Sequence, residues 1–545
     1  MEHLLAKTFA EHRSSEPNHR AEIAPTSTSE NLVPQGFSRA PVSSPSPRIG
    51  SEVLKQPTYN SGITRIAHSH SPQLLSGDRV QVGIDMPKDN DSIIPMSITH
   101  PHDQALSRGP RSSFPTLHPL PSKSVALELI MDMFSNFNKY FHVFDEREFL
   151  QQFEEWYLDS NPGQPDWWAS INAVLALGHR FRAMRTLTTA YDNKQSCGYI
   201  HNAIAVISEL SLMQQSLLAI QALLCIVLII QATPNPHPAS ILIATTMRLA
   251  QSMGLHRKCQ DPTLTETKIE QRRRVFWAVY FLDRDISLRI GQAYSQDDDD
   301  MDVELPSGVV PSLGPGEPGF CPVDFFNTRI GLAVLQGQIY KLLYSVRASQ
   351  QSRSQTEAVA LQLNTALLYW KSSVPIDFED TLGGVISVPL SPEALHMLIL
   401  RFTYLHCLAL VDRHLPPPEH FMAEHSPHLI VPSESTCVVQ SRKAFRLLQI
   451  APQGDYACVW LLLQPWYAIS TVLLRNVLRY PASPQALSDI LLVNPFLQLL
   501  KNLAGDERQC SRSEEAKRMY REGQDLSDQA TALAERALQM GFSVC

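Results

Sequence analysis

The sequence predicts an all-α protein in which a large multi-helix domain follows a disordered N-terminal tail. From residue 124 onward, apolar residues recur at the intervals of three and four that bury one face of a helix. No run alternates polar and apolar residues as a strand does, and no Asn-Gly or Asp-Gly pair marks a hairpin. Hydrophobic residues make up 44% of the 545 residues, which is enough for a large core.

The first 120 residues differ in composition from the rest of the chain. They hold 14 of the 39 prolines and 18 serines. Proline removes a hydrogen-bond donor and fixes φ, so a stretch such as 41–47 forms neither helix nor sheet. The few apolar residues here show no sustained period and bury too little surface to offset the entropy of ordering. We therefore expect residues 1–120 to be a disordered tail.

Helical periodicity then continues almost to the end of the chain. Ser216 and Ser240 suit N-caps, and Gly254 and Gly291 suit helix ends. The predicted helices lie at about 124–134, 146–158, 166–182, 196–210, 217–231, 241–253, 266–290, 324–348, 355–373, 392–413, 434–450, 457–479, 484–502 and 512–540.

The longest apolar run, Leu217–Ile230, is interrupted by Gln221 and is shorter than the roughly 20 residues of a membrane-spanning helix. We interpret it as a buried helix. Met1–Ala10 lacks the apolar core of a signal peptide. The sequence therefore favours a soluble, intracellular protein without a membrane partner.

Charge and cysteine content exclude two classes of protein. The net charge is −8 and only 18% of residues are charged, which excludes a strongly basic nucleic-acid binder over the chain as a whole. Nine cysteines are too few for a disulfide scaffold, and no two are separated by two residues, so no paired-cysteine zinc site can be assigned.

Residues 238–306 are the most informative segment. One helix ends in Gly254-Leu255-His256-Arg257, and a second runs over 266–290 and stops at Gly291. An acidic segment, Asp297 to Asp300 with Asp302, follows and leads to Leu305-Pro306. Asp283 falls on the apolar face of the second helix, where a buried carboxylate needs a partner. We expect that partner to be an arginine from elsewhere in the chain.

This segment resembles the middle homology region of fungal zinc-cluster transcription factors over about 60 residues. Weaker likeness extends over roughly 120–480. The residues that carry the motif, and that we take as its candidate structural site, are Gly254, Leu255, His256, Arg257, Arg273, Trp277, Asp283, Arg284, Gly291 and Pro306.

The resemblance implies an organisation and a function. It divides the chain into a tail over 1–120, an all-α regulatory domain over 121–480 and C-terminal helices over 481–545. It implies a nuclear regulator, shared with the cytoplasm, that controls transcription by RNA polymerase II. Its implied partners are other transcription factors or coregulators, together with a small-molecule effector and a second copy in a dimer. No catalytic residue is assigned.

The chain departs from that family at its N-terminal side. The family carries six cysteines that hold two zinc ions beside a DNA-reading segment, but residues 1–196 contain no cysteine. Zinc is therefore expected for the family and not assigned here, no other cofactor or metal site is predicted, and contact with DNA is expected to be indirect. The alternative is a helical interaction or scaffold protein that has lost DNA binding.

Three further patterns allow sharper interpretations. Arg272–Arg274 is either a nuclear-import or phosphate-contacting patch, or a solvated helix face with one arginine turned inward to a carboxylate, which we favour. Asp298-Asp299-x-x-Asp302 resembles the Mg²⁺-binding motif of all-α diphosphate enzymes, but a loop position favours a solvated acidic segment. His179 and His256 lack a second ligand at metal spacing, so we expect hydrogen-bonded structural roles.

Overall fold

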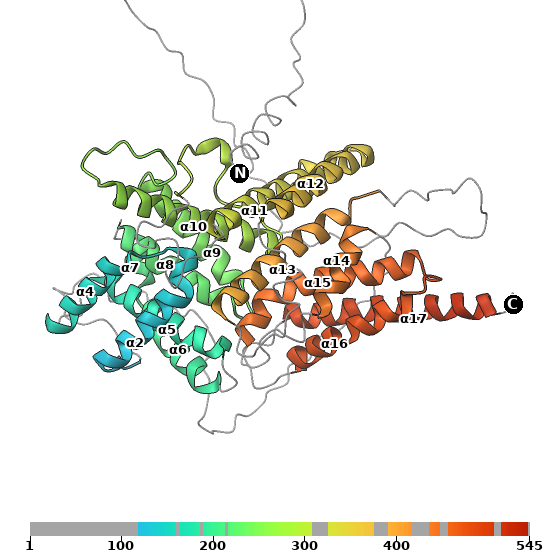
Figure 1. Ribbon diagram of the computed structural model, residues 1–545, viewed down its shortest axis with the longest axis horizontal. Helices are drawn as coiled ribbons and strands as arrows, with labels where there is room; N and C mark the ends of the chain where they lie inside the picture. Colours follow the sequence, from blue (N-terminus) through green and yellow to red (C-terminus); the bar gives the residue numbers. More distant parts are fainter. Residues whose placement is uncertain are drawn as a thin grey trace, which may run out of the picture. The chain divides into compact units, whose positions relative to one another are not determined.

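The computed structural model describes most of the chain after residue 117, and every regular element in the described part is helical. The described residues are 118–159, 164–185, 189–212, 216–307, 325–374, 391–416, 435–446, 456–505 and 514–542. The all-α prediction is confirmed for these residues (Figure 1). The predicted tail, except its last three residues, lies outside them.

The helices follow one another closely along the chain. They are α2 (Lys123–Met133), α3 (Lys139–Phe141), α4 (Glu146–Asp159), α5 (Pro165–Arg185), α6 (Thr189–Ile204), α7 (Ile207–Leu212), α8 (Leu217–Ile230), α9 (His237–Ser252), α10 (Glu266–Ile290), α11 (Phe325–Ile339), α12 (Arg353–Ser373), α13 (Pro392–Asp412), α14 (Thr436–Arg446), α15 (Tyr456–Arg479), α16 (Ala486–Gly505) and α17 (Glu514–Phe542). Short π or 3₁₀ turns lie at Phe134–Asn138, Asp298–Asp300, Tyr340–Tyr344 and Ala348–Gln350.

Three details differ from the predicted helices. The helix predicted over 324–348 is α11, which ends at Ile339, followed by a π turn that ends before the extended Ser345. The helix predicted over 196–210 is two helices, α6 and α7. Ser240 lies inside α9 and is not its N-cap, because Pro238 occupies the second helical position and the helix begins earlier, after Pro236. Ser216 is an N-cap as predicted, and its side chain accepts a hydrogen bond from the Ala219 N–H.

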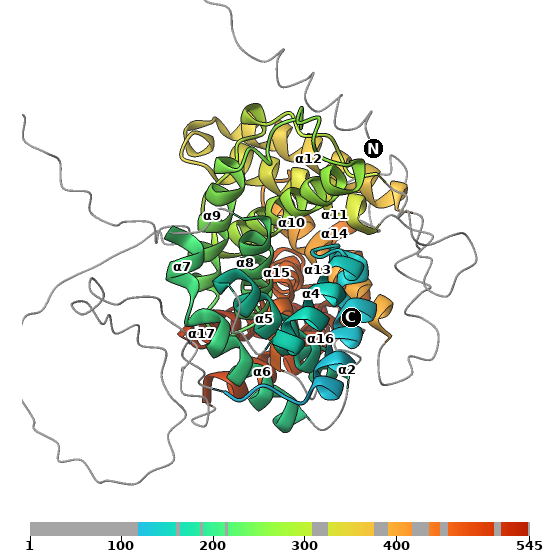
Figure 2. The ribbon, with the colours of Figure 1, turned by 90° about the vertical axis from the view of Figure 1, so that its left-hand side faces the viewer.

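Helix α8 forms part of the core because it is apolar on every side. All of its residues from Ala219 to Ile230 are buried. It packs against α5 and α9, and α9 packs in turn against α10. Residues Val275 to Leu288 of α10 are also all buried, and this helix contacts α11 (Figure 2). The central segment of the sequence motif therefore lies inside the helical packing.

Helices α13 and α15 are long and apolar enough to cross a membrane by length and composition. In each of them most of the apolar window is buried within the helical domain, 83% in Pro392–Asp412 and 78% in Cys458–Arg479. The two helices pack against each other, and α15 also contacts α14, α16 and α17. Such burial is that of core helices, whose apolar surface is removed from water by neighbouring helices.

Candidate functional site: the strap on helix α10

The motif residues gather around one segment, residues 292–307, which we call the strap. It begins where Gly291 ends α10 in the left-handed conformation, with φ of 71°. Gly254 ends α9 in the same way, with φ of 70°. In both turns the residue after the glycine donates its N–H back to the helix, Gln292 to the Ser287 carbonyl and Leu255 to the Ala250 carbonyl. Each glycine therefore supplies a backbone conformation that other residues rarely adopt.

The strap runs back to the turn that follows α9. The N–H groups of Asp302 and Val303 donate to the His256 carbonyl oxygen over 3.1 and 3.2 Å. The Asp302 carboxylate accepts from the Lys258 N–H over 2.9 Å and lies 4.0 Å from the exposed Arg257 guanidinium. Burial lowers the pKa of His256. His256 thus positions the strap through its backbone carbonyl, whereas Arg257 approaches the strap through its exposed side chain.

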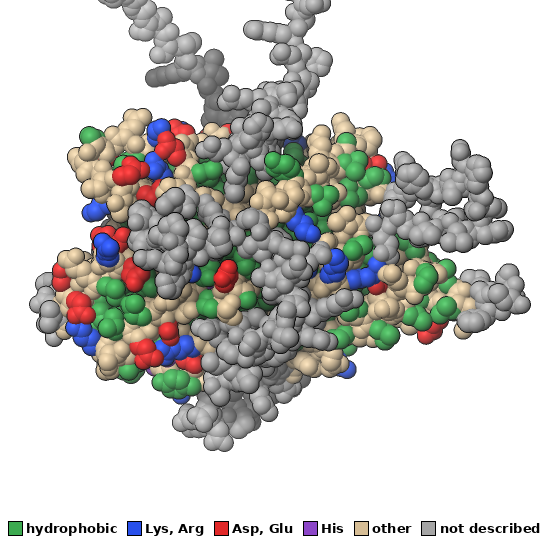
Figure 3. Space-filling view, in the orientation of Figure 1, with side chains coloured by type: hydrophobic (Ala, Val, Ile, Leu, Met, Phe, Trp, Pro, Cys, Tyr) green, Lys and Arg blue, Asp and Glu red, His purple; other side chains and the backbone are tan. Residues whose placement is uncertain are grey.

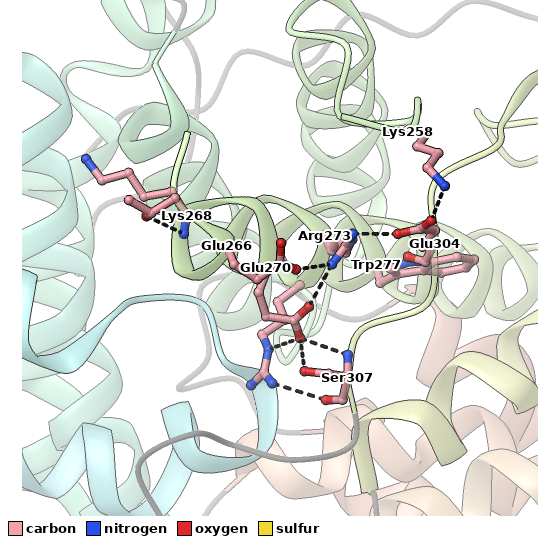
Figure 4. Close-up of polar contacts among 10 residues, drawn as sticks. Lys258, Glu266, Lys268, Glu270, Arg273, Trp277, Glu304 and Ser307 are labelled. Atoms are coloured by element: carbon pink, nitrogen blue, oxygen red, sulfur yellow. Dashed lines mark hydrogen bonds and ion pairs between the residues drawn. The ribbon is translucent and has the colours of Figure 1, made fainter. Parts of the chain in front are cut away.

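Arg273 and Trp277 hold the last part of the strap. Arg273 forms ion pairs with Glu304 and with Glu266, the latter at 3.0 Å. The Trp277 indole N–H donates to the Glu304 carbonyl oxygen over 2.9 Å, and Lys258 pairs with the Glu304 carboxylate (Figure 4). Glu304 of the strap is therefore bound through both its backbone carbonyl and its carboxylate.

Glu270 forms the most buried acidic contact at this end of the strap. It is 8% exposed, and its Oε1 accepts from the Ser307 N–H at 2.9 Å and from the Ser307 hydroxyl at 3.0 Å. The same oxygen accepts from Arg274 Nε at 2.9 Å. The favoured interpretation that one arginine of the triplet turns inward to a carboxylate is confirmed by Arg274. Arg272 also has a partner, the Met253 carbonyl oxygen, at 3.0 Å.

Asp283 is buried as expected, but its predicted arginine partner is wrong. The residue is 1% exposed, and its carboxylate accepts from the N–H and the hydroxyl of Ser295 over 2.7 and 3.0 Å. Burial raises the pKa of Asp283, while the Ser295 hydrogen bonds and the charge of Arg284 act in the opposite direction. The Ser295 backbone N–H therefore provides the contact to the buried carboxylate that we expected from an arginine.

Arg284 binds the middle of the strap. Its side chain is completely buried, and Nη2 donates to the Gln296 carbonyl oxygen at 2.7 Å and to Asp298 at 2.6 Å. The Tyr280 hydroxyl donates to the same Asp298 oxygen at 2.7 Å. The guanidinium lies 3.4 Å from the centre of the Tyr294 ring, a cation–π contact. Two aromatic rings and one carboxylate thus stabilise a charge inside the protein.

The acidic run has a structural arrangement. Asp297 caps the 3₁₀ turn by accepting from the Asp299 N–H, and its carboxylate lies 3.6 Å from Lys341 Nζ. Asp298 pairs with Arg284. In the described part of the chain, no group of three or more His, Cys, Asp or Glu residues is placed to hold a metal ion. Asp299 is exposed, as expected for a solvated acidic segment.

The two histidines considered as metal ligands lie in different surroundings. His179 Nδ1 lies 2.7 Å from the Asp192 carboxylate, and the ring stacks on Tyr199 at 5.8 Å between centroids. This hydrogen bond fits the structural role expected for His179. His256 contributes its carbonyl oxygen to the strap.

The structure brings all ten motif residues to the strap or to the turns that bound it. Leu255 and Pro306 are buried, and the Pro306 carbonyl accepts from Asn327 over 3.1 Å. The motif did not identify Tyr294, Ser295 or Ser307. All three belong to the strap. The strap is not helical, so the spacing of apolar residues in the sequence does not indicate where it runs. Chemically, the arrangement is a set of ion pairs and hydrogen bonds that holds a loop to a helix. Nε and Nη1 of Arg284 are buried without a hydrogen-bond partner in the part of the chain that the structure describes.

Comparison with known proteins identifies the family of this domain. Residues 133–372, which include all of α10 and the strap, match the fungal specific transcription factor domain. The ABC-transporter-regulating transcription factors of Aspergillus oryzae and Aspergillus fumigatus are 38% and 37% identical to the chain over 406 residues, which is 71% of this chain and 45% of each relative. The Fusaridione A cluster transcription factor of Fusarium heterosporum is 27% identical over 398 residues, 71% of this chain and 74% of that relative.

The predicted resemblance is confirmed, although the chain spans about half the length of the two Aspergillus relatives. No solved structure matches the chain. The domain borders at 120 and 480 stay predictions.

Proposed function

Because residues 133–372 are a fungal specific transcription factor domain, we propose that this chain is a nuclear regulator of transcription by RNA polymerase II. The observation that carries the proposal is the 38% identity over 406 residues to an ABC-transporter-regulating transcription factor. Genes for ABC transporters are therefore the first targets to test. In this proposal a small-molecule effector and dimerisation regulate the domain, and a share of the protein resides in the cytoplasm.

The proposal places recognition of DNA outside the helical domain. Arg272, Arg273 and Arg274 all bind groups of the protein itself, which opposes a phosphate-contacting role. On the face shown in Figure 3, basic and acidic side chains lie interspersed. Binding of nucleic acid depends on clustered cations that release counterions from phosphates. The proposed regulator therefore acts on genes through transcription factors or coregulators.

A reporter experiment tests the proposal. The 545-residue chain, fused to a heterologous DNA-binding domain, should change reporter expression relative to that DNA-binding domain alone. Chromatin occupancy of the unfused chain at ABC-transporter promoters should be detectable and should depend on a partner. Failure of both measurements would contradict a role in transcription.

A DNA-binding experiment separates direct from indirect action. Since residues 1–196 contain no cysteine and the net charge is −8, the purified chain should bind duplex DNA weakly and without sequence preference. It should also contain less than one zinc ion per chain. Tight, sequence-specific binding by the chain alone would show that it reads DNA directly.

The second candidate is a scaffold protein that uses the same domain only to bind other proteins. The partners that Arg272, Arg273 and Arg274 have within the protein favour it, because these cations are engaged by protein groups and are not offered to phosphates. Partner binding without any reporter or chromatin signal would support this candidate. The Mg²⁺-dependent enzyme has weaker support, since Asp298 of its motif pairs with Arg284. A diphosphate turnover assay tests it.

A further inference from the structure

Arg329 on α11 is a buried cation with an unusual environment. It is 9% exposed, and its guanidinium lies 5.1 Å from the centre of the Phe141 ring and 4.6 Å from that of Phe281. Among the residues that the structure describes, its guanidinium has neither an ion-pair partner nor a hydrogen-bond partner. The buried Arg274 and Arg284, by contrast, each pair with a carboxylate. Burying a charge without such a partner is costly, so Arg329 requires an explanation.

The carboxylate that acts electrostatically on Arg329, that of Asp285, does not supply that partner. Asp285 favours the charged form of Arg329 electrostatically, but its oxygens bind Arg289 at 3.3 Å and Gln336 at 3.0 Å. Burial lowers the pKa of Arg329 to about 10, so the side chain still carries its charge near neutral pH. The site thus holds a cation whose hydrogen-bond donors have no acceptor in the described part of the protein.

A second unsatisfied group lies beside the same aromatic ring. His396 of α13 is 2% exposed, and its Nε2 is 2.9 Å from the Asn136 carbonyl oxygen. A carbonyl oxygen only accepts, so Nε2 carries the hydrogen and Nδ1 is a bare acceptor. Nδ1 is buried and has no hydrogen-bond partner. The His396 ring lies 5.7 Å from Phe141, the ring that also contacts Arg329.

The surroundings of these two groups are aromatic. The His396 ring is within 6.0 Å, between centroids, of the rings of Phe137, Tyr140, Phe181 and Phe325. Ligand sites combine such apolar walls with a few polar groups that fix orientation. Arginine in particular binds carboxylates through two parallel N–H donors.

We propose that Arg329 and His396 form the polar contacts of a binding site for a small aromatic carboxylate. The ligand carboxylate pairs with the Arg329 guanidinium, and its ring packs among the phenyl side chains that flank both residues. A ligand hydroxyl or amide N–H donates to His396 Nδ1. The site joins α11, α13 and the segment around Phe141, so an occupant binds three separate parts of the domain. Binding itself is independent of transcription, whereas control of genes by this ligand rests on the proposed function.

Calorimetry with the full chain tests the site. The probes are 2-naphthoate and benzoate, with 2-naphthamide as the neutral analogue of matched shape. The carboxylates should bind saturably and the amide at least about tenfold more weakly, because a charged pair is replaced by a neutral contact. Equal affinity for 2-naphthoate and 2-naphthamide, or no saturable binding of either carboxylate, would overturn the proposal. Solvation of Arg329 by buried water alone gives the second of these results.

Variants locate the binding. Arg329→Met should remove the preference for carboxylate over amide, and Arg329→Lys should keep it with lower affinity. Arg353→Met, at an arginine on α12 that is 85% exposed, should bind as the wild type does. Arg329→Met should also melt no lower than the wild type, since it removes a buried charge without a partner. A preference that persists in Arg329→Met, or a large loss of stability in both Arg329 variants, would contradict the assignment.

A reporter assay then separates this inference from the proposed function. If 2-naphthoate binds through Arg329 and changes expression from the tethered chain, both are supported. If it binds in this way and the tethered chain never affects the reporter, the site stands and the role in transcription fails.

Discussion

Gly337 on α11 leaves the space that the Arg284 guanidinium occupies. A Cβ added at Gly337 would lie 2.9 Å from Arg284 Cζ and closer still to Nη1. Arg284 reaches Asp298 and the Gln296 carbonyl oxygen from this position. A glycine inside a helix is intrinsically unfavourable, so its presence here is explained by the close approach of the arginine.

Gly337→Ala should therefore destabilise the domain although alanine is the better helix former. Overpacking a core typically costs about 1–3 kcal/mol, which exceeds the roughly 1 kcal/mol that alanine contributes to a helix. Urea or thermal denaturation measures the change. Gly505→Ala is the matched control, because nothing lies within 4 Å of a Cβ at that helical position. An equal effect at both glycines would show that Arg284 does not need the space.

Asp298→Ala and Asp299→Ala form a pair of neighbouring substitutions with different expected results. Asp298 binds the completely buried Arg284 side chain, and removing one partner of a buried ion pair typically costs about 3–5 kcal/mol. Asp299 is exposed, so its removal should change the free energy of unfolding by less than about 0.5 kcal/mol. Denaturation of both variants compares them. Equal effects on the free energy of unfolding would mean that Asp298 does not hold the strap. A Mg²⁺-dependent activity that is lost in Asp299→Ala would favour the alternative that the chain is a Mg²⁺-dependent enzyme.

The order of helices could be predicted because each buries an apolar stripe or, like α8, is apolar throughout. The caps at Ser216, Gly254 and Gly291 could be predicted because their conformations suit particular residue types. Ser240 misled the prediction, since a serine near a proline suits an N-cap while Pro238 allows the helix to begin earlier.

The site was predictable only in part. The motif identified Asp283 and Arg284, and burial of Asp283 followed from its position on an apolar face. Their partners, Ser295 and Asp298, come from a loop, and one of the two contacts that Ser295 makes to Asp283 is through its backbone N–H. A backbone N–H donor cannot be recognised from the residue type. We therefore expected a charged side chain, an arginine, as the partner of Asp283. Arg329 carried no signal either, because its lack of a partner is a property of the folded arrangement.

Buried histidines should make the protein acid-sensitive. Burial lowers the pKa of His396 and of His142 to about 3 and that of His406 to about 4, from 6.5. As pH falls below 6.5 the unfolded chain binds protons that the folded chain does not, so stability decreases, by about 1.4 kcal/mol per pH unit for each such group. His396→Gln should reduce this slope by about one proton, and His237→Gln, at an exposed histidine, should not. Urea denaturation between pH 7 and pH 4.5 measures it. An unchanged slope in His396→Gln would show that His396 is not buried as a neutral ring.

Asp283→Asn and Asp283→Ala separate the hydrogen bond of this residue from its charge. Because burial raises the pKa of Asp283 above 3.8, the folded chain holds a proton there at pH values where the unfolded chain has released it. The stability that this proton confers is present below pH 3.8 and is lost as pH rises through the folded pKa. Near neutral pH, Asp283→Asn should therefore be at least as stable as the wild type, since its amide oxygen still accepts from the Ser295 N–H and its NH₂ can donate to the hydroxyl. Asp283→Ala leaves that N–H without an acceptor and should lose about 1–3 kcal/mol at any pH. Denaturation at pH 4 and pH 7 decides whether the hydrogen bonds or the charge of this carboxylate stabilise the protein. If Asp283→Asn is as destabilising as Asp283→Ala at pH 7, the charge itself is needed. A cationic partner, as we first expected, must then bind it.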